Sequence, residues 1–307
     1  MATANAYPES EYLRMARRVL EEGKPRADRT GTGTISLFGE QMRFDISKSV
    51  PLLTTKFVPW KAVIKELLWM CRGETDAGIL QKQGVRVWDG NSSRAFLDSR
   101  GLCDMPEGDI GGGYGHVWRY CGAPYKTCKD DYTGQGIDQL AEIEHSLKTD
   151  PMSRRHFMTA WYPPGLERMA LPPCHLSVQF YVDIDEDKAT EAAGAQTKHL
   201  SAHMYQRSQD TLLGAPFNIF SYTVLTYILA KKCNMTPRTL IISTGDTHIY
   251  QDHIDCMKEQ LNRTPFAPPQ LVVDDSVATK DWSEITLDDF KLVNYEHHPA
   301  IKANMSV

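Results

Sequence analysis

Residues 175–184 alternate between polar and apolar side chains, which is the pattern of a β-strand with one buried face. The apolar face carries Leu176, Val178, Phe180, Val182 and Ile184, and the other face carries His175, Ser177, Gln179 and Tyr181. Such a strand needs neighbouring strands and a layer packed on its apolar side. The chain must therefore build a sheet around this segment.

Further strands are expected at residues 34–46, 156–161, 200–207 and 239–244. The segment at 200–207 is the expected partner of the alternating strand. Residues 183–198 lie between the two and read DIDEDKATEAAGAQTK, acidic and then small and polar. We predict a long, mobile hairpin connection there and no domain boundary.

Helical periodicity is clear in three segments. Residues 60–71 are apolar nearly all round, which predicts a buried helix. Residues 137–147 form an amphipathic pattern. Residues 216–232 open with a proline and close with two lysines, both of which suit helix ends. The Asp-Thr pair at 246–247 is a good N-cap and predicts the start of a fourth helix.

A length of 307 residues alone favours about two domains of about 150 residues each. However, no repeat, low-complexity tract or Pro/Gly/Ser linker divides the chain. Strand and helix patterns alternate throughout. We therefore predict one domain over residues 1–307, of α/β (α+β) class, with a large mixed sheet packed by helices.

Composition excludes several classes of protein. With 34 Lys and Arg against 39 Asp and Glu, the net charge of −5 argues against a general nucleic-acid binder, although a few arginines can still hold a small anion. Seven cysteines without a Cys-x-x-Cys pair form neither a disulfide framework nor a zinc ribbon, so we expect no metal. No signal peptide or membrane span is visible. A cytoplasmic location is the default expectation, and nuclear or organellar residence stays open.

Cys174 is a candidate nucleophile because two prolines in Leu171-Pro-Pro-Cys-His175 fix the chain just before a strand. A buried structural cysteine is the equal alternative. A reactive thiolate needs nearby positive charge to lower its pKa from about 8.5. His175 is adjacent, but neighbouring strand residues point to opposite faces, so it is not automatically the base.

Four arginines occupy turns or strand ends, where phosphate clamps are found. Arg29 lies in a glycine-rich turn at 28–33, Arg154 and Arg155 precede a strand, and Arg207 lies near the end of another. For each arginine, a solvated surface charge is the alternative.

Four other polar side chains are candidates for chemistry. Glu66 is ringed by apolar residues on its helix, so its pKa should be raised, unless its tip reaches water. Asn218 falls in a first helical turn, and its amide can read an edge such as that of uracil or simply cap the helix. His248 and Tyr250, at the expected fourth helix start, could bind hydroxyls or could pack there.

Together these segments resemble the thymidylate synthase family of folate-dependent, cysteine-nucleophile enzymes, from about residue 28 to residue 307. The motifs stand in the family's order: DRTGTGT at 28–34, PLLTTK at 51–56, KELLW at 65–69, VWDGN at 87–91, LPPCH at 171–175, YQRS at 205–208, GAPFNI at 214–219, GDTHIY at 245–250 and HHPAIKANMSV at 297–307. LPPCH and PFNI are specific individually.

The resemblance implies a reaction. Deoxyuridine monophosphate (dUMP) would receive a one-carbon unit and then hydride from methylenetetrahydrofolate, leaving dTMP and dihydrofolate. The thiolate of Cys174 would add to uracil carbon 6 and make carbon 5 nucleophilic. The resemblance also implies a homodimer formed through the sheet, with two composite sites.

By the same resemblance, the substrate site would use Arg29, His175, Gln206, Arg207, Ser208, Gln209, Asp210, Asn218, His248 and Tyr250, with Arg154 and Arg155 contributed by the partner subunit. Within this set the arginines and Ser208 would hold the phosphate, Asn218 would read the uracil edge, and His248 and Tyr250 would bind the ribose hydroxyl. Glu66 would relay protons and Tyr114 would assist removal of the ring proton.

The folate site would be lined by Trp88, Asn91, Asp210, Leu213, Gly214, Phe217, Met305 and Ser306, with Asp210 on the pterin. The tail ending in Val307 would close over the reactants.

Three features depart from the family pattern. The family's Gly-Pro-Val before the site tyrosine is Gly111-Gly112-Gly113 here, which raises local chain entropy before Tyr114. Tyr162, where the family often has asparagine, follows Trp161. The connection at 183–198 is longer than is common, and we expect it to be peripheral.

The sequence leaves two alternative functions. A pyrimidine-nucleotide hydroxymethylase shares the fold and nucleophile, but its cytidylate form typically has aspartate where Asn218 stands, and Trp88 and the intact tail favour hydride transfer. A catalytically dead nucleotide- or RNA-binding protein is the second, and neither a missing site residue nor a basic stripe supports it.

Overall fold

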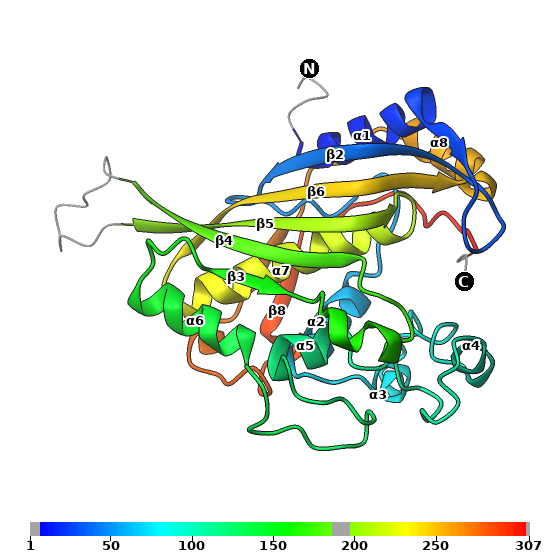
Figure 1. Cartoon of the computed structure of the whole chain (residues 1–307). Coiled ribbons are helices and arrows are strands. Elements are labelled where there is room, and N and C mark those ends of the chain that lie inside the picture. The colour runs from blue at the N-terminus through cyan, green and yellow to red at the C-terminus, as the bar shows by residue number, and fades with distance from the viewer. Residues whose placement is uncertain (1–6, 186–196, 305–307) are drawn as a thin grey trace.

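A six-stranded mixed sheet forms the centre of the computed structural model, which describes residues 7–185 and 197–304 (Figure 1). In spatial order its strands are β1 (Lys24–Arg26), β2 (Thr34–Asp45), β6 (Thr236–Tyr250), β5 (Thr197–Asp210), β4 (His175–Asp185) and β3 (Phe157–Thr159). Only β5 and β6 pair in parallel, and the other neighbours are antiparallel. The predicted fold class, a mixed sheet packed by helices, is confirmed.

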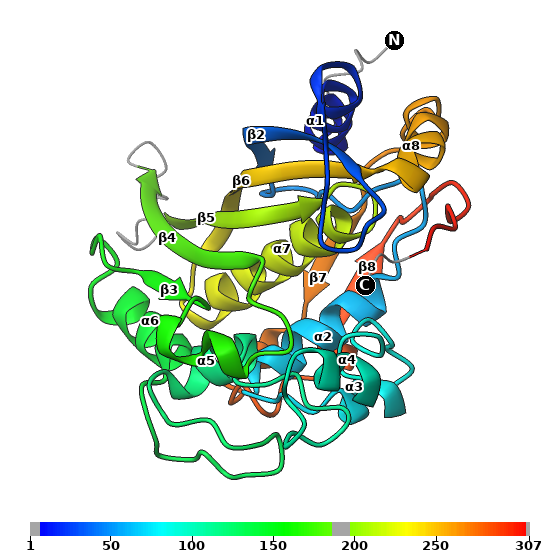
Figure 2. The ribbon, with the colours of Figure 1, turned by 45° about the vertical axis from the view of Figure 1, so that its right-hand side comes forward.

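One long helix covers the inner face of this sheet. α7 (Gly214–Lys232) connects the parallel strands and packs on both β5 and β6. Its side chains are buried nearly all round, because α2 (Trp60–Cys71) lies against its other side (Figure 2). The sheet and the two helices therefore form the main hydrophobic core.

Shorter elements surround this core. The remaining helices are α1 (Glu9–Glu22), α3 (Ala77–Lys82), α4 (Arg94–Ser99), α5 (Tyr114–Tyr120), α6 (Gln139–Thr149) and α8 (Ile254–Leu261). Short 3₁₀ helices are η1 (Pro163–Arg168), η3 (Gln251–His253), η4 (Asp275–Ala278) and η5 (Leu287–Asp289). A small second sheet pairs β7 (Gln270–Val273) with β8 (Phe290–Val293).

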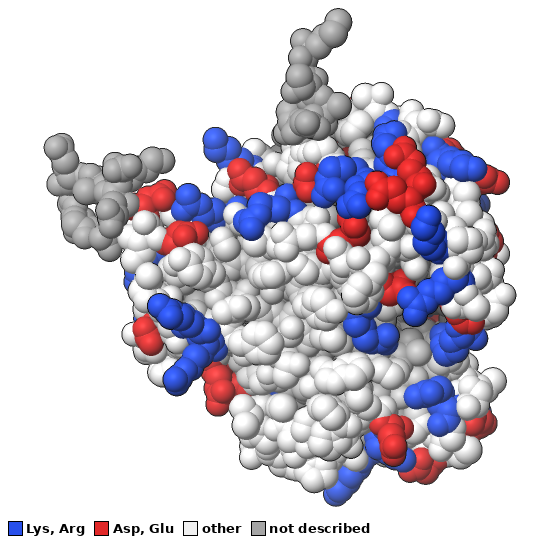
Figure 3. Space-filling model, turned by 45° about the horizontal axis from the view of Figure 1, so that its top comes forward, with Lys and Arg blue, Asp and Glu red and all other residues white. Residues whose placement is uncertain are grey.

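The outer face of the main sheet carries exposed aromatic side chains. Phe157, Tyr181 and Tyr205, from β3, β4 and β5, are 53%, 59% and 41% exposed. Figure 3 shows charged side chains gathered in a band, beside a wide area with few of them. Exposed aromatic side chains that share one face of a sheet, as these three do, are typical of an interaction surface.

Three predicted helices are confirmed, but the fourth was wrong. Asp246 and Thr247 lie inside β6, and the next helix is α8, which starts at Ile254. Thr247 pairs with Leu37 of β2 and Gln209 of β5. Sheet neighbours therefore supply the hydrogen bonds that a helix start would need, and the cap signal cannot reveal them.

The alternating strand is confirmed as β4, but the position of His175 was wrong. Val178, Phe180 and Val182 are at most 2% exposed, as expected. A register shift against β5 between His175 and Ser177 reverses the alternation there. His175 therefore turns inward and is only 8% exposed.

The connection predicted at residues 183–198 is shorter than expected. The two strands continue to a pair between Asp185 and Thr197. Residues 186–196 lie outside the described residues.

Candidate active site

Cys174 directly precedes β4 and is held by backbone bonds on both sides, as its proline context predicted. Its N–H donates to the hydroxyl of Tyr114 at 2.7 Å. Its carbonyl accepts from the N–H of Arg207 at 2.8 Å. The thiol is therefore fixed between the first turn of α5 and strand β5.

The guanidinium of Arg207 lies against this thiol. Nε and Nη2 donate to the carbonyls of Pro173 and Pro172, each at 2.8 Å, and Nη2 stands 3.7 Å from Cys174 Sγ. Burial raises the pKa of the Cys174 thiol, and the Arg207 charge opposes that rise. Arg207 is thus the nearby cation that a thiolate requires.

Behind the thiol, Tyr114 and His175 stack with their ring centroids 4.0 Å apart. Nδ1 of His175 bonds the hydroxyl of Tyr222 at 2.8 Å. Burial lowers the pKa of His175 to about 3, so its ring is neutral near pH 7. His175 therefore contributes packing and a hydrogen bond, while the positive charge comes from Arg207.

Buried amides orient Asn218, which is the fifth residue of α7 and lies just past the first turn where it was expected, because the helix starts before Pro216. Nε2 of Gln206 donates to Asn218 Oδ1 and to the carbonyl of Ser208, each at 3.0 Å. Nε2 of Gln209 in turn donates to Gln206 Oε1 at 3.3 Å. Because Gln206 donates to Oδ1, these bonds set the orientation of the Asn218 side-chain amide, with its oxygen towards Gln206.

Glu66 on α2 has the raised pKa that its apolar neighbours predicted. Burial raises the pKa of its carboxyl to about 7, although Trp88 Nε1 donates to Oε1 at 2.8 Å and opposes the rise. The ring of Trp88 lies 6.2 Å from that of Tyr114. Glu66 is thereby linked through two aromatic rings to the surroundings of Cys174.

A second group of side chains gathers at the end of β5 and β6. Asp210 accepts from the N–H groups of Leu212 and Leu213 at 2.9 and 3.1 Å, which turns the chain into α7. His248 bonds Asp246 at 3.1 Å, and Tyr250 lies edge-on to it. Both lie on β6, where an α-helix start was expected, and Tyr250, the last residue of the strand, is the N-cap of the 3₁₀ turn η3.

Three residues near the candidate site were not singled out from the sequence. Lys56 donates to the carbonyl of Leu212, and burial lowers its pKa to about 8. His253 binds the carbonyl of Asn304 at 2.7 Å, and Tyr222 binds His175. The PLLTTK motif contained Lys56, whereas only tertiary contacts reveal the other two.

The structure does not bring every predicted arginine to the thiol. Arg29 is exposed on the turn between β1 and β2, with its guanidinium 5.9 Å from the Phe96 ring centroid. Arg154 and Arg155 are exposed and precede β3, at the opposite edge of the sheet. Within one chain, Arg207 alone of the four contacts Cys174.

Most candidates for the folate site lie near the start of α7 and the turn after α3. Trp88, Leu213, Gly214 and Phe217 are half-buried. Asn91 is 6% exposed, and its Nδ2 lacks a hydrogen-bond partner among the described residues. Met305 and Ser306 lie outside the described residues.

Within residues 7–185 and 197–304, no group of three or more His, Cys, Asp or Glu side chains could hold a metal ion. In the same residues, no helix is long and apolar enough to cross a membrane.

Comparisons with known proteins agree over nearly the whole chain. The family model described as Thymidylate synthase matches residues 10–307. Thymidylate synthase of Saccharomyces cerevisiae is 49% identical over 301 residues, with 97% of each chain covered. That of Candida albicans is 48% identical, with 97% of this chain and 98% of the relative covered. That of human herpesvirus 8 is 48% identical, with 98% and 85% covered.

Proposed function

The chain belongs to the thymidylate synthase family of methyltransferase-type enzymes, and on that premise we propose that Cys174 performs the reductive methylation of dUMP through a covalent adduct. The observation that carries this proposal is the 3.7 Å approach of the Arg207 guanidinium to Cys174 Sγ. A hydroxymethylase of the same fold is not favoured, because the similar relatives are thymidylate synthases.

The first step is addition of the Cys174 thiolate to carbon 6 of the uracil ring. A carbon–sulfur bond forms, and the electron pair moves to give an enolate that is nucleophilic at carbon 5. Arg207 stabilises the thiolate before this step, against the effect of burial. The bond from Cys174 N–H to Tyr114 and the two proline carbonyls that hold Arg207 keep both groups in place.

Base recognition is assigned to Asn218. Its amide offers one acceptor and one donor, which match the N3–H and O4 edge of uracil. Gln206 already donates to Oδ1, which fixes the orientation of the amide before substrate arrives. Discrimination then follows from the mismatch that a cytosine edge would present.

Proton transfers are assigned to Glu66 and Tyr114. A carboxyl with a pKa of about 7 is present in both protonation states near neutral pH, as a proton relay requires. Burial raises the pKa of Tyr114, as does the negative charge of Cys174, so its hydroxyl keeps its proton. It can therefore order the path by which the carbon 5 proton leaves.

The reduced folate supplies the one-carbon unit and the hydride. The residues fit such a group, since the buried Nδ2 of Asn91 has no partner in the described chain. Trp88, Leu213 and Phe217 offer half-buried apolar surface for its rings, and Asp210 offers a carboxylate for the pterin. Met305 and Ser306 would complete the site from the tail.

We assign the phosphate to Arg29, Arg207 and Ser208, together with Arg154 and Arg155 of a second subunit. The support is the exposure of Arg154 and Arg155 beside the exposed aromatic face of β3, β4 and β5. Pairing of that face in a two-fold dimer would bury it and would carry the arginines of one chain towards the thiol of the other. We propose a homodimer with two composite sites, located in the cytoplasm.

The test is incubation of the purified chain with dUMP and methylenetetrahydrofolate, following dihydrofolate by absorbance and product by mass. A product heavier than dUMP by one methylene group, formed with one dihydrofolate each, is expected. A hydroxymethyl product without dihydrofolate would overturn the proposal.

A further inference from the structure

The turn that leads into Tyr114 consists of three consecutive glycines, which by themselves would leave this tyrosine poorly fixed. Gly111 must be glycine, since its φ is +80° and an added Cβ would lie 2.0 Å from the carbonyl oxygen of Arg168. Gly113 has no such need, because its φ is −82° and the nearest atom to an added Cβ lies 4.0 Å away. Something outside the turn must therefore restrict it.

A fully buried carboxylate provides that restriction. Asp109 is 0% exposed and accepts three hydrogen bonds. Its Oδ1 accepts from the N–H of Gly111 at 2.7 Å and from the hydroxyl of Tyr125 at 2.5 Å, and its Oδ2 accepts from the N–H of Cys128 at 2.8 Å. No ion pair to Asp109 is found within the described chain. Burying an unpaired carboxylate is unfavourable unless such donors satisfy it.

The second member of this arrangement is Tyr125, from the loop that the Cys121–Ile137 bridge closes. Its hydroxyl also bonds Thr75 Oγ1 at 2.9 Å, and its ring packs on Gly112, where an added Cβ would lie 3.0 Å from it. Burial raises the pKa of Tyr125 well above its usual value, with a further rise from Asp109, so the hydroxyl donates.

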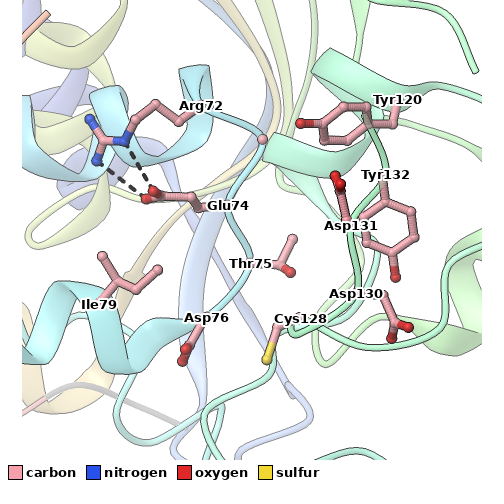
Figure 4. Close-up of a pocket in the computed structure, with 11 residues that line it drawn as sticks. Arg72, Glu74, Thr75, Asp76, Ile79, Tyr120, Cys128, Asp130, Asp131 and Tyr132 are labelled. Atoms are coloured by element: carbon pink, nitrogen blue, oxygen red, sulfur yellow. Dashed lines mark hydrogen bonds and ion pairs between the residues drawn. The ribbon is translucent and has the colours of Figure 1, made fainter. Parts of the chain in front are cut away.

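The loop at 121–137 and the glycine turn at 111–113 are both bonded to the segment that carries Thr75 and Asp76. Figure 4 shows Thr75 and Asp76 on one side of a hollow and Cys128 and Tyr132 on the other. Asp76 pairs with Asp109 in a short backbone bridge, and Lys129 of the loop forms an ion pair with Asp76.

We propose that Asp109 and Tyr125 are positioning residues for catalysis: they clamp the glycine turn so that the Tyr114 hydroxyl stays against the Cys174 N–H. The clamp takes the place of the proline and valine that the family pattern has at 112 and 113. It acts through Tyr114, and so rests on the proposed role of that residue in removing the carbon 5 proton.

The test compares Tyr125→Phe and Asp109→Asn with the matched control Tyr132→Phe. Tyr132 stacks on Tyr125 with ring centroids 5.6 Å apart, but its hydroxyl bonds Thr127 and Lys126 rather than Asp109. We expect kcat to fall about tenfold in Tyr125→Phe and further in Asp109→Asn. Release of tritium from carbon 5 of labelled dUMP should slow equally, while dUMP affinity changes less than about twofold. Tyr132→Phe should leave kcat unchanged.

Rescue separates positioning from a merely structural role. An alanine Cβ at position 113 has room, and it reduces the backbone conformations open to the turn. Gly113→Ala should therefore restore kcat severalfold in the Asp109→Asn background. Gly111→Ala should not, because its Cβ meets Arg168. If both clamp variants lower only the melting temperature, with kcat per dUMP-binding site unchanged, or if Gly113→Ala gives no recovery, the positioning role is overturned.

Tyr114→Phe distinguishes this proposal from the function on which it rests. If Tyr114→Phe slows proton release while Tyr125→Phe and Asp109→Asn do not, the clamp is wrong and the role of Tyr114 stands. If Tyr114→Phe turns over at the wild-type rate, the role of Tyr114 fails, and the clamp fails with it.

Discussion

Two regions are built differently: the surroundings of Cys174, called the thiol side, and the arginines that we propose hold the phosphate, called the phosphate side. Cys174, His175 and Gln206 lie at the paired ends of β4 and β5, and their backbone or side-chain groups are bonded within one chain. Arg29 and Arg155 are exposed, near opposite edges of the same sheet. One chain therefore brings together the groups around Cys174, whereas Arg207 is the only one of the four candidate arginines that it brings to the thiol.

This difference has a physical basis. A nucleophile must keep its geometry within a fraction of an ångström, which paired strands provide. A phosphate can be gripped by long side chains that adjust to it, and such side chains can reach across a subunit boundary. The predictions below test each side in turn, beginning with the largest effect.

Replacing Cys174, the proposed nucleophile, should abolish turnover and leave binding of dUMP by the phosphate side nearly unchanged. For Cys174→Ser we expect kcat to fall by at least about a thousandfold, because a serine hydroxyl beside Arg207 stays protonated. Binding of dUMP, measured by calorimetry, should change by less than about tenfold. Turnover near the wild-type rate would contradict the covalent mechanism.

Changing the base-reading amide should alter selectivity, still on the thiol side. In Asn218→Asp, a carboxyl group replaces the amide donor, which disfavours the O4 of uracil and favours the amino group of cytosine. We expect the ratio of kcat/KM for dUMP over dCMP to fall about a hundredfold. An unchanged ratio would remove Asn218 from base recognition.

The half-buried Glu66, whose carboxyl has a raised pKa, should make stability depend on pH. Its folded pKa of about 7 lies above the unfolded value of about 4.3, so stability is lost as pH rises through this range. Glu66→Gln should therefore be more stable than the wild type by up to about 3 kcal/mol at pH 8 and equal to it at pH 4. Urea unfolding at both pH values measures this difference. A gain that is the same at both values would contradict the raised pKa.

Substitutions on the phosphate side should lower activity less than those on the thiol side. For Arg155→Ala we expect the KM for dUMP to rise about tenfold with kcat nearly unchanged, because one charged hydrogen-bonding group is lost. Arg168→Ala, which removes an exposed arginine bonded to Asp104, is the matched control and should leave KM unchanged.

Mixing subunits shows where Arg155 acts. Arg155→Ala and Cys174→Ser chains, combined at subsaturating dUMP, should regain activity up to about a quarter of that of the wild type, since half the dimers carry one intact site. If mixing restores nothing while Arg155→Ala alone is impaired, the arginine serves its own subunit.

The predictions from sequence were most successful where the cause was local. The helix at 60–71 and the raised pKa of Glu66 depend on residues within a few positions of each other, so spacing along the chain was sufficient. The strand entrance at Cys174 was fixed by its own two prolines. Such features are confirmed with little change.

The sequence predictions that were wrong, and the features that were missed, depend on contacts between residues that are distant in the chain. The inward turn of His175 follows from a register shift against β5, and the continuation of β6 past Asp246 follows from its pairing with β2 and β5. The three glycines before Tyr114 predicted a loose turn, and a carboxylate bonded by residues up to 19 positions away restrains it.

The sequence by itself therefore determined the family and most of the helices and strands, and it pointed to Cys174, because those are written in contiguous motifs. Tertiary structure decided which cation faces the thiol, which histidine is neutral, and which arginines are left at the edges of the sheet. Charges and hydrogen bonds act over a few ångströms of space, and only the folded chain brings residues as far apart as Tyr114, Cys174 and Arg207 within that range.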